Sequence, residues 1–501
     1  MIVYLPQNFR FIFILPKHFT YFSTNPELNF KLQSTGFKTL DYKNFNREKL
    51  FESSINFQSK LLELSKNNKY DSLNYISNFN YLKNKNSFHF KQEIEKLTNK
   101  KVYFINQYFN HKNFKLLLSS LINKRFHQFI YSYLIILINF PFTFLKLFKI
   151  LFKKHSIIDA SKSVSKNIST KFNIKNYYVI SNVLFDKNSI SFKPLIFLFS
   201  VFCFPLLIFQ TFKLISIEKK LIRYNYLRFK NYFDTILLTY FSFVFRKIFT
   251  FNFYTLNNLG LSEAMINNGD KKSNHLINHG VHYFDNVKKL NLAWIFHSKT
   301  IFNSKNAILY SSNIFDKIFL LKNMYSNDVN FKKPFINYST ESVKVEYSNN
   351  NNNILIADTF KDDNYLRPFL YHDALQYIKF LKVIVDSLSN TSNNIIIRHR
   401  DDSIISCKYI KKIFKNFSNV VIRSDGKLTD FFKNDPVVIS YSSTVIFESL
   451  LFNLRTISFD FFNTGINFLN APNFNKNLPI SKRFFYRINS ENDLKYLICK
   501  I

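Results

Sequence analysis

Cysteine, glycine and tryptophan are scarce in this chain of 501 residues, which contains 3 Cys, 6 Gly and 1 Trp. The cysteines, Cys203, Cys407 and Cys499, lie far apart in the sequence and form no Cys-x-x-Cys pair. A disulfide framework or a cysteine-based zinc site is therefore not expected, and a reducing cytosolic setting fits the composition.

Acidic residues are also few, since 33 Asp and Glu stand against 69 Lys and Arg and give a formal net charge of +36. Such an excess favours polyanionic partners, namely nucleic acids, anionic lipids, or nucleotide and phosphate substrates. No signature of a nucleic-acid-binding module accompanies the charge, so a specific nucleic-acid partner is not expected. Lys, Asn, Ile, Phe and Tyr are abundant together, as in proteins encoded by AT-rich DNA, so we attribute part of the charge to compositional bias.

The length exceeds the size at which one hydrophobic core keeps growing, so two folded domains are expected. The run 348–353, SNNNNN, has no apolar residue and is the strongest linker signal. We expect an amino-terminal extension, partly of low complexity, at 1–100, an α/β domain at 101–347, the linker at 348–353, a second α/β domain at 354–480 and a carboxyl-terminal helix at 481–501.

Short apolar runs alternate with helical patterns in both domains, which indicates parallel sheets with crossover helices. The first domain has strand signals at 101–106, 176–183, 249–255, 275–278 and 306–311, and helix signals at 261–267 and 314–321. The second domain has strand signals at 354–357, 394–398, 420–423, 437–440 and 455–459, and helix signals at 372–388 and 408–417.

Two uncharged apolar stretches, 129–145 and 194–212, are flanked by lysines. The second approaches the roughly 20 residues that a membrane-spanning helix needs. Three alternatives remain open for both: spanning helices, helices lying in the membrane interface with a basic rim, and aromatic-rich core helices. Their aromatic content and internal prolines favour the interface or the core. The apolar amino terminus is interrupted by Pro6, Arg10 and Pro16, so we expect a buried strand pair or an interfacial segment there rather than a secretory signal.

The most informative stretch, Leu428–Asp460, predicts two buried strands separated by a helix. Ser442, Ser443 and Thr444 offer helix caps directly after the first strand, where backbone N–H groups and the helix dipole favour a phosphate. Glu448 lies four residues after Thr444 and shares its helix face. A capping box would need a spacing of three, so a ligand role for Glu448 is favoured over a role in helix capping alone.

Other strand ends carry further polar residues. Arg398, His399 and Arg400 follow the strand at 394–398, where guanidinium groups are suited to bidentate phosphate contacts. In the first domain His279 and Gly280 follow the strand at 275–278. His279 can act as a base toward an acceptor hydroxyl, with His275 and His282 as rivals, and Gly280 permits a close backbone approach to a ligand.

The acid before an apolar strand, the Ser-Ser-Thr segment, Glu448 and the next strand together resemble the carboxyl-terminal half of GT-B-fold glycosyltransferases. The resemblance covers about residues 249–465 and is closest to bacterial surface and capsule polysaccharide enzymes and the related CDP-glycerol glycerophosphotransferases. It implies an α/β chain with two Rossmann-like domains, and a helical, apolar and basic insertion is expected in the amino half. It also implies that Ser442, Ser443 and Thr444 bind the donor diphosphate and that Glu448 binds ribose or sugar hydroxyls.

This sequence departs from the family pattern at two places. Asn278 stands where Gln usually precedes the His-Gly pair, and the loop Arg398-His399-Arg400 lacks the proline that usually follows its histidine. By resemblance, His279 and Gly280 face an interdomain cleft, and Arg398 with His399 meets donor phosphate.

The expected activity is transfer of a sugar from a nucleotide-sugar donor to a surface-polysaccharide or lipid-linked acceptor. No convincing Asp-x-Asp motif is present, so we expect a metal-independent transferase without a cofactor. An alternative is a glycerophosphotransferase that uses a CDP-linked glycerol or polyol, and an alternative of another class is a non-catalytic membrane-associated scaffold. The expected location is cytoplasmic and peripheral, on the anionic inner face of the cell membrane.

Overall fold

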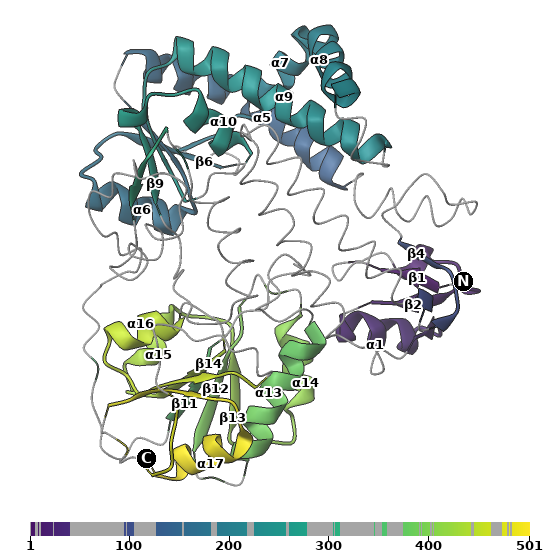
Figure 1. The fold of residues 1–501 in the computed structure, drawn as a ribbon, viewed down its shortest axis with the longest axis vertical. Coiled ribbons are helices and arrows are strands. Elements are labelled where there is room, and N and C mark those ends of the chain that lie inside the picture. Colours follow the sequence, from purple (N-terminus) through teal and green to yellow (C-terminus); the bar gives the residue numbers. More distant parts are fainter. Residues whose placement is uncertain are drawn as a thin grey trace.

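A computed structural model of the protein describes residues 2–5, 9, 12–23, 25–40, 95–96, 98–104, 127–152, 155–181, 188–217, 225–256, 260–277, 304, 306–310, 345, 353–357, 374–389, 391, 393–400, 403, 405–441, 445–461, 473–477, 480 and 483–500. The described strands form three parallel sheets, one of four strands and two of six (Figure 1). The mixed α/β architecture predicted from the sequence is therefore confirmed.

The first sheet has the strand order β3-β2-β1-β4. Its strands are β1 Ile2–Tyr4, β2 Thr20–Phe22, β3 Lys38–Thr39 and β4 Val102–Phe104, and the 3-10 turn η1 Ile12–Ile14 precedes β2. Helix α1, Pro26–Ser34, begins because the Asn25 side chain accepts hydrogen bonds from the first free N–H groups and Pro26 suits the first turn. The expected strand at 101–106 is present as β4, but it pairs with β1 instead of opening the second sheet.

The second sheet has the order β10-β9-β8-β5-β6-β7. Its strands are β5 Ser156–Asp159, β6 Tyr177–Ile180, β7 Ser189–Ile190, β8 Asn252–Thr255, β9 Asn274–Ile277 and β10 Ile308–Tyr310. The first strand of this sheet in the sequence, β5, lies at its centre. Strands β6 and β7 follow on one side of β5, and β8, β9 and β10 follow on the other side. This is the strand order of Rossmann folds, with a topological switch point between β5 and β8.

Helices cover both faces of the second sheet. They are α5 His127–Phe152, α6 Lys162–Lys171, α7 Lys193–Phe202, α8 Phe204–Ile217, α9 Asn225–Ile248 and α10 Leu261–Asn267, followed by the 3-10 turn η4 Lys271–Ser273. One face packs against apolar residues of α5, α9 and α10, including Leu147, Phe245 and Met265. The other face packs against α6 through Ile168.

The apolar stretch 194–212 forms two helices rather than one. Helices α7 and α8 are bent by 81° at Cys203. Pro205 explains the break, because it has no N–H to continue the helical ladder and its ring collides with the carbonyl four residues earlier. Within the described residues, no single helix has the length and hydropathy of a membrane span, and α7 with α8 reaches them only as this bent pair.

The third sheet has the order β13-β12-β11-β14-β15-β16, which is again the Rossmann order. Its strands are β11 Asn353–Ile356, β12 Asn394–Arg398, β13 Val420–Arg423, β14 Val437–Ser440, β15 Thr456–Phe459 and β16 Phe485–Ile488. Its helices are α13 Ala374–Leu388, α14 Cys407–Ile413, α15 Leu428–Phe432, α16 Val445–Leu451 and α17 Glu491–Cys499.

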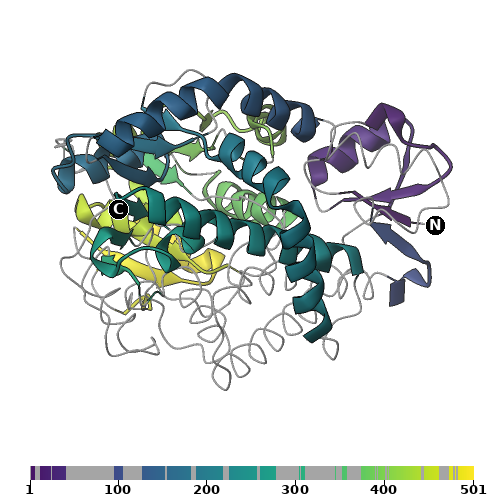
Figure 2. The same ribbon diagram turned by 90° about the horizontal axis from the view of Figure 1, so that it is seen from above.

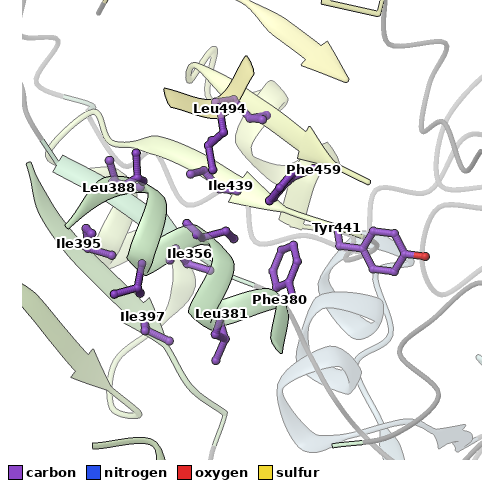
Figure 3. Close-up of a cluster of buried hydrophobic side chains, with 14 of the residues drawn as sticks. Ile356, Phe380, Leu381, Leu388, Ile395, Ile397, Ile439, Tyr441, Phe459 and Leu494 are labelled. Carbon is purple, nitrogen blue, oxygen red and sulfur yellow. The ribbon is translucent and has the colours of Figure 1, made fainter. Parts of the chain in front are cut away.

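The central strands of this sheet are apolar throughout because both faces are covered. Ile354 and Ile356 pack on the side of α13 and α17, whereas Leu355 between them packs on the side of α15 and α16. Figure 3 shows Phe380, Leu381 and Leu388 of α13 against the sheet residues, with Leu494 of α17 beside them. The alternating αβ pattern predicted for this part of the chain is confirmed, whereas β5, β7 and β16 were not predicted.

Candidate functional site

The third sheet changes winding direction between β11 and β14, and three of the predicted donor residues, Arg398, Arg400 and Glu448, lie on or directly after elements next to this switch point. Strand β11 pairs with β12 on one side and β14 on the other. In sheets of this kind, ligands bind outside the carboxyl ends of the strands next to the switch point. Those ends are followed here by Ala357, by the loop that begins at His399, and by the segment from Tyr441 to α16.

Glu448 lies in α16, partly buried behind the end of β14. Burial raises the pKa of its carboxyl group to about 7, while the positive charges of Arg398 and Arg400 oppose this rise. Both guanidinium groups therefore lie close enough to act electrostatically on the Glu448 carboxyl. The structure brings together three residues that the sequence placed at separate strand and helix positions.

Arg398 is the last residue of β12, and its guanidinium carbon lies 6.0 Å from the ring centroid of Phe431 in α15. This position over an aromatic face limits the directions that the side chain takes. Arg400 follows two residues later, and its carbonyl accepts a hydrogen bond from Ser403 N at 3.0 Å, which turns the loop back on itself. Two positive charges are thus placed at the carboxyl end of one strand.

His399 lies between these arginines but is buried, with 2% of its surface exposed. Its Nε2 lies 2.7 Å from the carbonyl oxygen of Ile405, and because a carbonyl only accepts, Nε2 carries the proton. Its backbone N donates to Arg423 O at 2.7 Å. The sequence predicted a donor-phosphate contact for His399, whereas these contacts hold the loop that carries the two arginines.

The far end of the same loop is held by helix α1, which follows β2 of the first sheet. The Glu27 carboxylate of α1 accepts hydrogen bonds from Ser406 N at 2.8 Å and Ser406 Oγ at 2.9 Å. Ser406 in turn caps α14 by accepting from Tyr409 N. Burial raises the pKa of Glu27, but hydrogen bonds from Lys31 and Ser406 outweigh it and leave the pKa below its usual value.

Two acids of the stretch Leu428–Asp460 have structural partners. Asp435, fully buried and with φ of 47°, accepts hydrogen bonds from Arg483 at 2.7 and 3.0 Å. Asp460 accepts one from Arg487 of β16 at 2.7 Å. These pairs tie β14 and β15 to the carboxyl-terminal segment. Residues 483–488 therefore belong to this sheet rather than to a separate terminal helix.

Five predicted site residues, His279, Gly280, Ser442, Ser443 and Thr444, lie outside the described residues, as does the rival His282. The other rival, His275, lies within β9. Its ring stacks on Tyr254 at 4.3 Å between centroids, and its Nδ1 is 3.2 Å from the Tyr310 hydroxyl. His275 is therefore part of the packing against α6.

The switch point of the second sheet holds a polar cluster that sequence reasoning missed. Asp159 ends β5 and accepts hydrogen bonds from Ser262 Oγ and from Thr255 Oγ1, the latter at 3.4 Å. Burial raises the pKa of Asp159, against the effect of both hydrogen bonds. The sequence indicates this cluster only by Asp159 at the end of the apolar run SIID, because the hydrogen-bond partners of Asp159 are 96 and 103 residues away.

Next to this cluster, Glu263 of α10 is buried, with 4% of its surface exposed. Burial raises its pKa to about 8, and its Oε2 has no hydrogen-bond partner among the residues that the structure describes. Across the described part of the chain, no group of three or more His, Cys, Asp or Glu residues is arranged to hold a metal ion. No protein-family model matches the chain, and no curated protein is significantly similar to it.

Proposed function

We propose that the protein is a metal-independent glycosyltransferase of GT-B architecture that moves a sugar from a nucleotide-sugar donor to a surface-polysaccharide or lipid-linked acceptor. The observation that carries the proposal is the placement of Arg398, Arg400 and Glu448 at the switch point of a sheet with Rossmann strand order. The second six-stranded sheet supports the acceptor side, because it offers an equivalent switch point.

The arginines act on the leaving group. When the glycosidic bond to the donor breaks, negative charge grows on the nucleoside diphosphate. Guanidinium groups fixed beside those oxygens stabilise this charge more in the transition state than in the ground state. Ser442, Ser443 and Thr444 supply further hydrogen-bond donors in this proposal, and Arg398 and Arg400 supply the positive charge.

Glu448 holds the donor through a ribose or sugar hydroxyl. A carboxyl group with a pKa of about 7 exists in both protonation states at neutral pH. Its ionised form accepts a hydrogen bond from the hydroxyl, and the arginine charges favour that form. On the acceptor side, His279 is the proposed base, with Gly280 beside it, and Asp159 is a second carboxylate at the end of a central strand of the facing sheet.

The second candidate reaction is transfer of glycerol phosphate or another phosphopolyol from a CDP-linked donor. It would use the same arginines, because the leaving group is again a nucleotide. The two reactions break different bonds: a sugar transferase releases the nucleoside diphosphate, or the monophosphate from a CMP-sugar, whereas a phosphopolyol transferase releases CMP from a CDP-linked donor.

The test is to measure nucleotide release from a panel of UDP-, GDP-, CMP-sugar and CDP-polyol donors in the presence of membrane-derived acceptors. We expect Arg398→Ala and Arg400→Ala each to lower release by about 100-fold, since each removes a group that stabilises the leaving charge. Arg423→Ala is the matched control, because Arg423 is an exposed arginine at the end of the neighbouring strand β13. If Arg398→Ala and Arg400→Ala released nucleotide as fast as the control Arg423→Ala does, the proposed role of Arg398 and Arg400 would be refuted. Absence of any donor that reacts or raises the unfolding temperature would favour the non-catalytic scaffold.

The proposal includes a peripheral location on the anionic inner face of the cell membrane, where lipid-linked acceptors are found. Its support is the net charge of +36 and the apolar helices around the second sheet.

A further inference from the structure

We call each of the three sheets, together with the helices packed on it, a unit, and number the units as the sheets. Exposed apolar side chains are concentrated on four helices of the second unit. Seventeen of the 21 large apolar side chains that are exposed in the described part of the chain belong to α5, α7, α8 and α9. Most are phenylalanines, and Phe202 at the end of α7 is 81% exposed. Apolar patches of such extent on soluble surfaces usually mark an interaction site. We call the exposed side of these four helices the aromatic face.

The four helices pack together into one layer. α5 packs against α7, and α9 packs against α7 and α8. α5 and α9 turn Leu147, Phe241 and Phe245 toward the second sheet, so their remaining sides are free to form the outer surface. Figure 1 shows this layer at one end of the molecule, on the opposite side of the second sheet from the third sheet, and Figure 2 shows the helices from outside.

The bend between α7 and α8 is the most apolar part of the aromatic face. Phe202 and Phe204 lie on either side of the 81° bend, and Val201, Leu206 and Phe209 lie within one or two turns of it. All five side chains are exposed. No charged residue occurs between Lys193 and Lys213. The bend is therefore an uncharged apolar tip with a lysine at each end.

The charged residues of these helices are almost all basic. Their sequences contain eight Lys or Arg residues and one acid, Asp234. Lys149, Lys213 and Lys247 are exposed along the aromatic face. Arg246 is excluded from this group, because it hydrogen-bonds Phe251 O, Ser273 and Asn274 within the second unit. An apolar surface with exposed lysines matches an anionic bilayer, whose headgroups carry the negative charge above an apolar interior.

We infer that the aromatic face of α5, α7, α8 and α9 is the membrane-docking surface, and that it lies in the interface of an anionic bilayer with the α7–α8 bend inserted deepest. The inference rests on the peripheral location proposed above but not on the transfer reaction. Phenylalanines at the bend enter the acyl region, while Lys149, Lys213 and Lys247 remain at headgroup level.

A lipid surface fits this face better than a second copy of the chain. In a symmetric dimer the same basic helices would face each other, so their lysines would repel across the contact and meet almost no acid. An orientation in the plane of the membrane also fits the helices, because the bend directs α7 and α8 away from a common axis. The second sheet, which forms the proposed acceptor side, then lies directly behind the membrane contact.

The experiment is co-sedimentation of the full chain with vesicles of phosphatidylcholine alone or mixed with phosphatidylglycerol, without donor or acceptor. We expect binding to the anionic vesicles, and the double variant Phe202→Ser with Phe209→Ser should lower the partition coefficient by at least about tenfold. Phe13→Ser is the matched control, because Phe13 is also 81% exposed but belongs to the first unit, and it should bind as the unchanged protein does. Circular dichroism and thermal unfolding verify that each variant is folded.

Insertion depth is measured with Phe202→Trp and Phe13→Trp, each made in protein whose one native tryptophan is replaced (Trp294→Phe), so that the introduced tryptophan is the only source of the emission. Tryptophan at 202 should shift its emission to the blue and be quenched by lipids brominated in the acyl chain, and tryptophan at 13 should show neither change. Binding that is unaffected by the Phe202/Phe209 double variant, or a tryptophan at 202 that remains exposed to water, would overturn the inference. So would a lipid-free dimer that the double variant converts to a monomer, which would assign the face to a second copy. Nucleotide release in solution by a protein that binds no vesicles would overturn this inference alone.

Discussion

Glu448 is the residue whose charge state the fold alters most within the proposed donor site. Burial raises its pKa to about 7 even though Arg398 and Arg400 favour ionisation. Since the ionised form is the proposed hydrogen-bond acceptor, donor turnover should rise as the pH increases through about 7. Glu448→Gln should lose this dependence and lower nucleotide release by about tenfold, the value of one hydrogen bond in the transition state. The measurement is kcat/KM against pH for both proteins.

The same titration fixes the sign of an effect on stability. The folded state retains the Glu448 proton up to about pH 7, whereas the unfolded chain releases it near pH 4.5. The stability that the protonated Glu448 carboxyl group contributes is therefore complete below about pH 4.5 and is lost as the pH rises to about 7. Glu448→Gln should be more stable than the unchanged protein at pH 8 and similar at pH 4. Glu263→Gln is the control, because Glu263 has a pKa of about 8 but no proposed substrate contact. It should gain stability at high pH with nucleotide release unchanged.

At the scale of elements, the loop between β12 and α14 carries the arginine pair and is held at both ends. Near the start of the loop, His399 hydrogen-bonds the carbonyl of Ile405. At the end of the loop, Ser406 donates two hydrogen bonds to the Glu27 carboxylate of α1. We expect Glu27→Ala to lower the free energy of unfolding by about 1–3 kcal/mol, because two hydrogen bonds from Ser406 to a charged, buried carboxylate are lost. It should also weaken nucleotide binding, measured as a smaller thermal shift with UDP. Lys31→Ala is the control, since it removes only an exposed partner of Glu27 and should change stability by less than about 1 kcal/mol.

A pH series separates the two contributions of Glu27. Its folded pKa is lowered, so the stability that it provides is present above about pH 4.5 and is lost as the pH falls through the folded value. The difference between Glu27→Ala and the unchanged protein should therefore shrink in acid. An undiminished UDP shift in Glu27→Ala would mean that the first unit does not support the donor loop.

The elements that could be predicted are those whose pattern is local. The runs of β11, β14 and β15 are apolar because both faces are buried, and α10 was predicted at its observed bounds. The partner of β4 could not be predicted, because β1 precedes it by about a hundred residues. The bend at Cys203 was also not predicted, although Pro205 contained its signal.

The same distinction applies to the candidate site. Arg398 and Glu448 were found because strand ends and helix starts are local features that point to one edge of a sheet. The link between Glu27 and Ser406 joins residues 379 positions apart, so nothing in either segment indicates it. The contact of His399 with Ile405 could not be predicted for a similar reason: the carbonyl of Ile405 becomes its neighbour only after the loop has folded back.

At the scale of the whole molecule, the net charge of +36 raises the question of whether total charge or its position controls membrane attachment. If position controls it, lysines on the aromatic face matter and equally exposed lysines elsewhere do not. The triple variant Lys149→Glu, Lys213→Glu, Lys247→Glu changes the charge on the face. Its matched control is Lys408→Glu, Lys411→Glu, Lys415→Glu, which makes the same change in net charge on and next to α14 of the third unit.

Vesicle binding at several salt concentrations distinguishes the two cases. Each headgroup-level lysine contributes roughly fivefold in affinity, so the variant on the aromatic face should lose more than about 100-fold binding to phosphatidylglycerol vesicles. The α14 variant should lose much less, because its charges lie more than a Debye length of about 8 Å from the bilayer at 0.15 M salt. The aromatic-face variant should also show a shallower dependence of binding on salt than the unchanged protein. Equal losses in both triple variants would mean that the excess charge acts as a diffuse property of the composition, and that phenylalanines alone orient the protein on the membrane.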